Sequence, residues 1–321
     1  MLSSLFGPPT LVGVDIGSHS IIVVEARVSS RYRFRVQAMA EVPTPLDSYV
    51  GGQVQNVEAL GEAIRSAVKA SRATGKKAVV AVPPQVGFLR KLAFPKMEMK
   101  ELRAAIELQP ERYIPFARDG AVFDLNILPG EAGEGQIWVV LAAAPRKYVL
   151  DLMAAVRTAG LTPVRVDLEP LALHRVAIAL KQASPEVGTA IVDLGVSVAK
   201  ISLFEGDVPV ISRVLDMPRP TAVSTTDPFA GVGTEELFLD IRRSLEFALT
   251  QTRTPPTRVL VVGGAGSDGY FALSLGAYLR GFLTTRLPGD FLVTPLQDRF
   301  LDVPVSHMLA LGLSLPPDLF S

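Results

Sequence analysis

The sequence predicts a duplicated α/β fold. In the segment Gly13–Glu25, apolar and mostly β-branched residues flank a short polar turn that begins with Asp15 in an Asp-x-Gly pattern. This pattern indicates a strand, a tight turn and a second strand. The same plan returns in Ala190–Phe204, where Asp193 begins the turn. Two copies of one unit far apart in the chain indicate a duplicated architecture.

The composition is typical of a globular protein. A length of 321 residues is enough for two domains or one bilobed unit. Hydrophobic residues make up 48% of the chain and charged residues 20%. The formal net charge is zero, and no basic stripe with interleaved aromatic residues is present, which argues against a nucleic-acid partner. Cysteine is absent and the three histidines are far apart, so thiolate or histidine metal sites are not predicted.

The start of the chain predicts neither a signal peptide nor a membrane span. No run approaches the roughly 18 apolar residues that cross a bilayer, and Met1–Gly7 lacks a basic start and a long apolar core. We therefore expect a cytoplasmic protein. Residues 1–10 are expected to be a flexible segment, although Leu2, Leu5 and Phe6 leave open a short amphipathic turn that touches a membrane or a partner.

The first subdomain is predicted to span residues 11–84. A third strand, Tyr32–Val42, extends the first hairpin into a meander. Asn56 is placed to cap a helix that continues to about Ala73, and Lys76–Val82 follows as a strand. This order opens a mixed sheet.

Residues 85–168 are predicted to form an inserted subdomain. Its elements are a strand (87–94), a helix (98–113), two strands (122–128 and 136–144), a helix (146–159) and a strand (164–168). This β-α-β-β-α-β order is typical of a small ferredoxin-like unit, and we expect Trp138 to pack within it.

Residues 169–321 are predicted to form the second half. After the helix 169–182, the second Asp-x-Gly unit continues into another meander that ends at Leu215. The stretch 217–233 has no periodic pattern and indicates a loop. A helix (234–252), a buried strand (258–262), a glycine-rich turn, a helix (270–279) and a final apolar turn of helix (307–313) complete the chain.

Four segments resemble the PilM family, the actin-like proteins of type IV pilus assembly. They are Gly13–Gly17, Glu111–Phe116, Arg242–Phe247 and Val261–Ser267. The resemblance implies an actin-like fold, a duplicated ribonuclease H-like architecture, with the ferredoxin-like insert described above. It also implies an ATP-binding cleft between the halves. A groove between the first subdomain and the insert would receive the N-terminal peptide of PilN, an inner-membrane protein.

The resemblance also assigns candidate cofactor residues. The residues that match the phosphate turns and the adenosine-side loop are Asp15, Gly17, Ser18, His19, Ser20, Asp193, Gly195, Gly263, Gly264 and Gly266. Amides and hydroxyls of such turns can cradle phosphate, and Asp15 and Asp193 would hold Mg²⁺ if ATP binds. The partner groove would be lined by Glu111, Arg112, Tyr113, Ile114 and Phe116.

Three departures from the family pattern predict weak or absent ATP binding. Ile22 stands where family members commonly carry a lysine, and Val198 and Ala199 stand where hydroxyl residues are usual. The loop 217–233 replaces a larger helical subdomain, so the second half is expected to be reduced. Lost charges and hydrogen-bond partners weaken phosphate capture.

These observations predict a non-catalytic scaffold of the pilus machine, held at the inner membrane by a PilN-like partner. Pilus motor ATPases and further copies of the chain are additional candidate partners. One alternative is an active ATPase or small-molecule kinase, for which Asp193 is the only candidate base. A second alternative is the actin-like component of a type II secretion platform, which would normally continue into a transmembrane segment.

Overall fold

The computed structural model describes most of the chain. The described residues are 10–30, 32–116, 120–184, 186–217, 234–252, 254, 256–264, 270–283, 292–296 and 302–317. The predictions for the N-terminal segment and for nearly all of the loop 217–233 therefore lie outside the described residues. None of the helices in the described ranges has the length and apolarity to cross a membrane.

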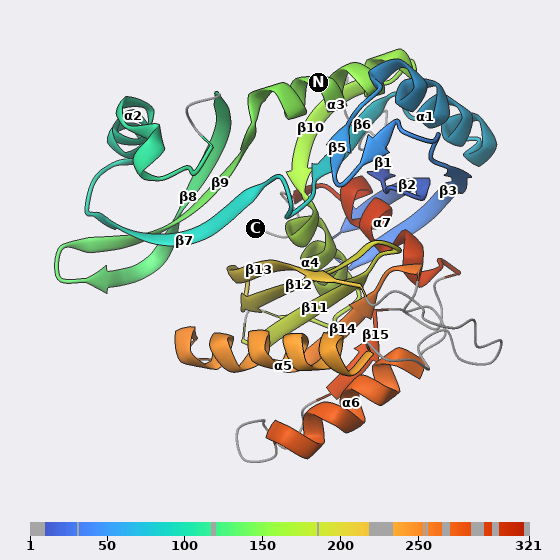
Figure 1. Cartoon of the computed structure of the whole chain (residues 1–321). Coiled ribbons are helices and arrows are strands. Elements are labelled where there is room, and N and C mark those ends of the chain that lie inside the picture. The colour runs from blue at the N-terminus through green and yellow to red at the C-terminus, as the bar shows by residue number, and fades with distance from the viewer. Residues whose placement is uncertain are drawn as a thin grey trace.

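Two five-stranded sheets with the same strand order form the body of the protein (Figure 1). The first contains β1 (Leu11–Ile16), β2 (Ser20–Ser30), β3 (Arg33–Pro43), β6 (Lys77–Val82) and β10 (Thr162–Leu168). The second contains β11 (Gly188–Leu194), β12 (Val198–Glu205), β13 (Val208–Asp216), β14 (Pro256–Val262) and β15 (Leu292–Pro295). In each sheet the first strand is antiparallel to the second and parallel to the fourth. The predicted duplication is confirmed.

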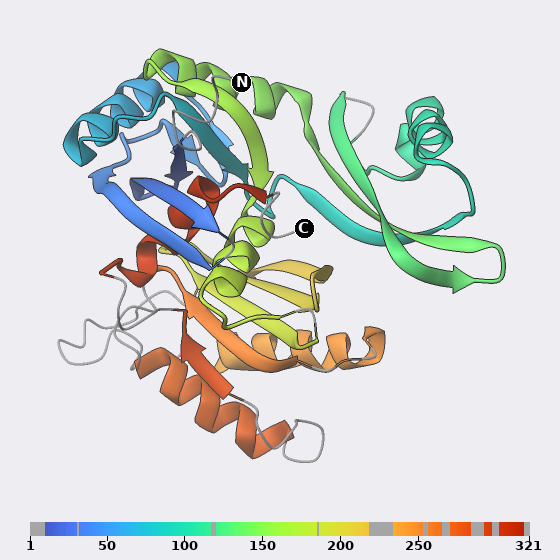
Figure 2. The ribbon, with the colours of Figure 1, turned by 180° about the vertical axis from the view of Figure 1, so that it is seen from behind.

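Helices cover both faces of each sheet, as the front and back views show (Figures 1 and 2). α1 (Val57–Ser71) and α3 (Arg146–Thr158) cover the outer face of the first sheet, and α5 (Thr234–Gln251) and α6 (Tyr270–Leu283) cover that of the second. Between the sheets lie α4 (Glu169–Ala179) and α7 (Met308–Ser314), which share one apolar core with both. The result is a five-layered α/β/α/β/α body.

The first helix begins where its sequence predicts. The Asn56 side chain accepts a hydrogen bond of 3.0 Å from the amide of Ala59, which satisfies one of the unpaired donors of the first turn. Leu60, Ile64 and Ala67 recur at helical spacing and are buried against the first sheet. The short hairpin of β4 (Tyr49–Val50) and β5 (Gln53–Val54) precedes this helix.

The inserted subdomain is smaller than the sequence predicts. It consists of β7 (Phe88–Pro95), α2 (Met99–Leu108), a short 3-10 turn (Pro110–Arg112), β8 (Ala121–Gly133) and β9 (Gln136–Pro145), with strand order β7-β9-β8. The insert projects to one side of the body (Figure 1). α2 covers one sheet face and buries Leu102 and Ile106 against Val139 and Leu141. Side chains alternate along a strand, so Trp138 points to the opposite face rather than into this core.

The predicted ferredoxin-like unit of residues 85–168 is divided between the insert and the first half of the protein. α3 packs against α1 at Gly61, where an added Cβ would lie 2.5 Å from Thr158. β10 pairs in parallel with β6 and extends the first sheet. The physical reason is that α3 buries Tyr148, Leu152 and Val156 in the core of the first half, which leaves no second helix for the insert.

The C-terminal helix α7 is wedged between β1 and α4. A Cβ at Gly13 of β1 would overlap the carbonyl oxygen of Ala310, and a Cβ at Gly312 would overlap the carbonyl oxygen of Ala172 on α4. These glycines are required because backbone approaches backbone, not because of an unusual φ. The final apolar helix predicted from the sequence is confirmed, and it ties the two halves together.

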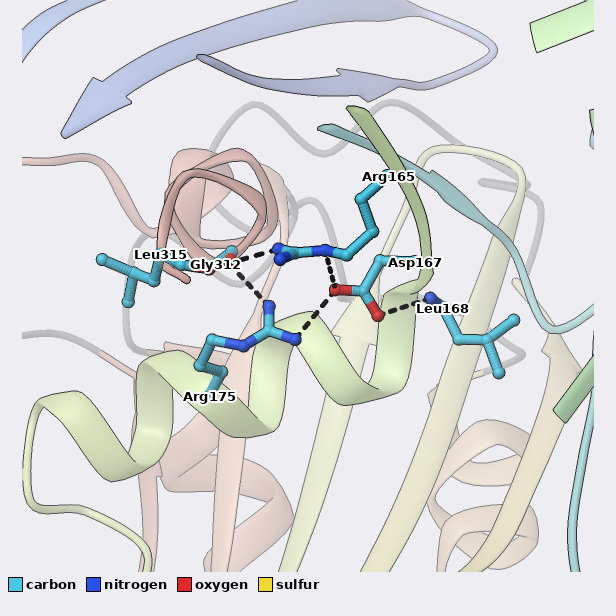
Figure 3. Close-up of polar contacts among 6 residues, drawn as sticks. All are labelled: Arg165, Asp167, Leu168, Arg175, Gly312 and Leu315. Atoms are coloured by element: carbon cyan, nitrogen blue, oxygen red, sulfur yellow. Dashed lines mark hydrogen bonds and ion pairs between the residues drawn. The ribbon is translucent and has the colours of Figure 1, made fainter. Parts of the chain in front are cut away.

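Polar contacts close the far end of α7 (Figure 3). Arg175 of α4 donates to the carbonyl of Gly312 and to Oδ2 of Asp167, both at 2.8 Å. Arg165 of β10 donates to the carbonyl of Leu315 at 3.3 Å and lies 3.4 Å from the same carboxylate oxygen. Two guanidinium groups thus cap the last carbonyls of the helix, and Asp167 holds both.

Candidate functional site

The two Asp-x-Gly hairpins meet across a cleft between the halves. Both turns are closed in the same way: Gly17 donates to the carbonyl of Ser20 at 2.9 Å, and Gly195 donates to that of Val198 at 3.1 Å. The hydroxyls of Ser18 and Ser197 lie 3.5 Å apart, one from each turn. A cleft of about 240 Å³ lies between the turns.

The cleft brings together almost all of the predicted cofactor residues. Its lining includes Asp15, Gly17, Ser18, His19, Ser20, Asp193, Gly195, Gly263 and Gly264. Gly266 lies outside the described residues. Ser197 is an addition that the sequence reasoning missed, and it supplies the second turn with a hydroxyl although Val198 and Ala199 do not. The start of the C-terminal region also reaches the cleft through Val305, Ser306 and Leu309.

A buried ion cluster forms the floor of the cleft. The Lys200 ammonium on β12 lies 2.7 Å from Oε2 of Glu169, the first residue of α4, and 3.3 Å from Oδ2 of Asp193. The three side chains are almost completely enclosed, with exposures of 6% for Glu169, 14% for Asp193 and 16% for Lys200. Because the buried ammonium has two carboxylate partners, both its position and its charge are held by the surrounding structure.

Lys200 is the counterpart of Ile22 in the internal repeat. In the first hairpin Asp15 lies opposite Ile22 in the strand register, and in the second hairpin Asp193 lies opposite Lys200. The cleft therefore has the lysine that the first turn lacks, from the other half of the molecule. Aligning the two hairpins by their Asp-x-Gly turns would have found it from the sequence. No comparable sequence pattern points to Glu169.

Burial and the charges of this cluster shift the pKa values of Asp15, Glu169 and Lys200. Burial raises the pKa of Asp15 to about 8, and the negative charge of Glu169 adds to this more than Lys200 subtracts. Burial also raises the pKa of Glu169, although Lys200 opposes that shift. Burial by itself would lower the pKa of Lys200, but Glu169 and Asp193 together raise it above its ordinary value, so the ammonium stays charged.

Asp15→Asn is expected to make the protein less sensitive to alkali. Because the native pKa of Asp15 lies near 8 and its ordinary value is 3.8, the native state holds a proton that the unfolded state releases between these values. Native stability therefore falls as the pH rises through this window. The variant should gain about 1–2 kcal/mol over the wild type by about pH 8, a figure reduced because the carboxyl group reaches cleft water. Urea unfolding at several pH values measures the difference, and a constant difference from about pH 5 to about pH 8 would contradict it.

The segment predicted to line the partner groove lies at the edge of the insert core. Ile114 is 1% exposed and packs inside that core, so its predicted role as a groove residue is corrected. Tyr113 packs against Phe94 with ring centroids 5.0 Å apart and the rings tilted by 33°, and Phe116 is partly buried. Glu111 and Arg112 are exposed. The apolar residues of this segment hold the insert together, and its charged residues face solvent.

A second hollow lies where the insert joins the body. This junction pocket has a volume of about 170 Å³ and is lined by Val82, Pro84, Gly87, Phe88, Leu89, Arg90, Leu168, Pro170 and Ser212. It is therefore bordered by the first half, by β7 of the insert and by β13 of the second half. The family resemblance implies a groove between the first subdomain and the insert, but it does not point to these residues.

The face of the insert that α2 leaves uncovered continues from this pocket. The Lys91 ammonium lies 4.6 Å from the centre of the Trp138 ring and 3.8 Å from Oε2 of Glu205 on β12. The cation–π contact lies within the insert, and the ion pair with Glu205 links the insert to the second half. Among the residues that the structure describes, no group of three or more histidines and acids has the geometry of a metal site.

The comparisons with known proteins agree with this architecture. The family model described as type IV pilus assembly protein PilM matches residues 13–217. A solved structure described as the PilM-PilN type IV pilus biogenesis complex is 26% identical, with a TM-score of 0.73, and the match covers 95% of this chain and 97% of that one.

A second solved structure shows the same fold at greater distance. The ethanolamine utilization protein EutJ from Carboxydothermus hydrogenoformans is 14% identical, with a TM-score of 0.52 and coverage of 96% of this chain and 90% of that one. Together these matches confirm the actin-like α/β fold.

Proposed function

The chain belongs to the PilM family of type IV pilus assembly proteins, and from this premise we propose that it is a non-catalytic scaffold that binds the N-terminal cytoplasmic peptide of a PilN-like protein. The observation that carries the proposal is the near full-length match to a structure solved as a PilM-PilN complex. Through this partner the scaffold would be held at the inner membrane.

The junction pocket supports the proposal and is the candidate binding site for the peptide. Apolar side chains of the first half and of the insert converge there, and Ser212 of β13 borders them. The exposed Arg90 stands beside them with its guanidinium 5.3 Å from the Phe88 ring. A peptide that places one apolar anchor in the pocket would bury it against Leu89 and Leu168. The arginine could then meet an acidic side chain or a carbonyl of the peptide.

Leu89→Ala is expected to weaken binding of the cognate PilN-like N-terminal peptide by about tenfold, since truncating an anchor contact costs about 1–2 kcal/mol. Fluorescence anisotropy with a labelled peptide measures the dissociation constant. Leu108→Ala is the matched control, because Leu108 is 79% exposed on α2 and does not line the pocket. Tyr113→Ala and Phe116→Ala test the segment selected from the sequence.

The possible results distinguish a wrong binding site from a wrong function. If the wild type does not bind the peptide at high concentration, the scaffold proposal fails. If the wild type binds and Leu89→Ala binds equally well, while Phe116→Ala does not, the function stands and the site moves to the 111–116 segment.

The absence of enzymatic activity is part of the proposal. Asp193, the candidate base selected from the sequence, is held in an ion pair with Lys200, which lowers its capacity to orient a water molecule. Steady ATP turnover that Asp193→Ala abolishes would overturn this part and favour the ATPase alternative. Calorimetric titration with ATP is the accompanying measurement of cleft binding.

A further inference from the structure

We propose that Lys200 is a built-in cation that occupies the place of a divalent metal ion in the cleft. Actin-like folds are expected to hold Mg²⁺ between the acids of the two turns, here Asp15 and Asp193. The residues of this chain do not fit that ion, because the Lys200 ammonium already pairs with Asp193, one of these two acids. The inference is independent of partner binding.

The ammonium group of Lys200 lies where the ion would bind. Nζ of Lys200 lies at hydrogen-bond distance from Glu169 and from Asp193, on the floor of the cleft that both turns line. A hard divalent cation binds carboxylate oxygens at about 2.0–2.6 Å, so it would compete with the ammonium for Oδ2 of Asp193. An ammonium tethered to the protein is always present and needs no dehydration of a free ion.

The charge of the cleft also disfavours the ion. Asp15, Glu169, Asp193 and Lys200 form one electrostatic group: the pKa of Asp15 responds to the charges of the other three, and the pKa of Glu169 responds to those of Lys200 and Asp193. Bringing Mg²⁺ beside the enclosed ammonium would place two positive centres together in a poorly solvated cleft, where charge repulsion is weakly screened. Removing the ammonium would leave three carboxyl groups facing one cavity without a cation.

The two repeats differ at the lysine position. Ile22, opposite Asp15, gives the first turn an apolar side chain where Lys200, opposite Asp193, gives the second turn a charged one. The lysine of the second hairpin therefore lies beside Asp193 and within reach of Glu169.

The test is a titration with Mn²⁺ alone, followed by electron paramagnetic resonance of the free ion. Lys200→Gln keeps a hydrogen-bond donor for Glu169 but removes the charge, and Lys200→Arg is the matched control that keeps the charge. We expect Lys200→Gln to bind Mn²⁺ at least about tenfold more tightly than the wild type, and Lys200→Arg to behave like the wild type.

Two results overturn the proposal: a wild type that binds Mn²⁺ as tightly as Lys200→Gln, or a folded Lys200→Gln protein that shows no gain. Circular dichroism checks folding, since removing one member of a buried pair can unfold the protein. If it does, the double variant Lys200→Gln with Glu169→Gln removes both members and leaves Asp15 and Asp193. It should still bind Mn²⁺ more tightly than the wild type, and no gain there also overturns the proposal. No partner peptide is used, so failure here leaves the scaffold function untouched.

Discussion

Asp167→Ala is expected to lower the free energy of unfolding by about 3–5 kcal/mol, the cost of breaking a buried ion pair by removing one partner. Oδ2 of Asp167 lies 2.8 Å from Arg175 and 3.4 Å from Arg165, and Oδ1 accepts a hydrogen bond of 2.8 Å from the amide of Leu168 (Figure 3). The substitution leaves two guanidinium groups side by side without their shared carboxylate. Because both also cap α7, the C-terminal helix should loosen from the body.

Urea unfolding followed by circular dichroism measures this effect. Asp151→Ala is the matched control: its carboxylate lies 2.6 Å from Lys147, whose side chain is 84% exposed, and a surface pair of this kind contributes less than about 1 kcal/mol. Asp167→Asn keeps the shape and one acceptor, so it should fall between the wild type and the alanine variant. Equal losses for Asp167→Ala and Asp151→Ala would show that the cluster at α7 contributes little stability.

The sequence predicts the duplicated body because the signal is local and occurs twice. Alternating or continuous apolar runs on either side of an Asp-x-Gly turn determine a hairpin without reference to the rest of the chain. The helix after Asn56 is predicted for the same reason, since its cap and its apolar stripe lie within one segment. The cofactor residues that follow from these hairpins meet at the cleft because both hairpins occupy the centre of their sheets.

Long-range pairing is what the sequence left undetermined. The β-α-β-β-α-β order of residues 85–168 is compatible with one compact unit, but pairing of β10 with β6 assigns its last helix and strand to the body. No local pattern carries that information. The same applies to Glu169 and Lys200, whose contact spans a helix, a turn and a strand. A weak signal did exist for Arg175, because a charged residue that lies between apolar residues in the middle of a buried helix requires a buried partner.

Gly13→Ala is expected to destabilise the protein by about 3 kcal/mol, at the upper end of the cost of overpacking a core. The added methyl group would overlap the carbonyl oxygen of Ala310 and lie 2.7 Å from the backbone nitrogen of Ser314. Both contacts are with backbone atoms of α7, so no side chain can rotate away. Either β1 or the whole helix must move.

Gly264→Ala is the matched control, because a Cβ at that position meets nothing within 4 Å. Thermal and urea unfolding of the two variants against the wild type give the comparison. If Gly13→Ala costs no more than Gly264→Ala, then α7 is not wedged against β1 as described. If it costs the expected amount, the first glycine of the Gly13–Gly17 segment serves helix packing, and only the residues from Asp15 onward serve the cleft. Since Val305, Ser306 and Leu309 lie on or next to α7 and line the cleft, a displaced helix would also change the shape of the site.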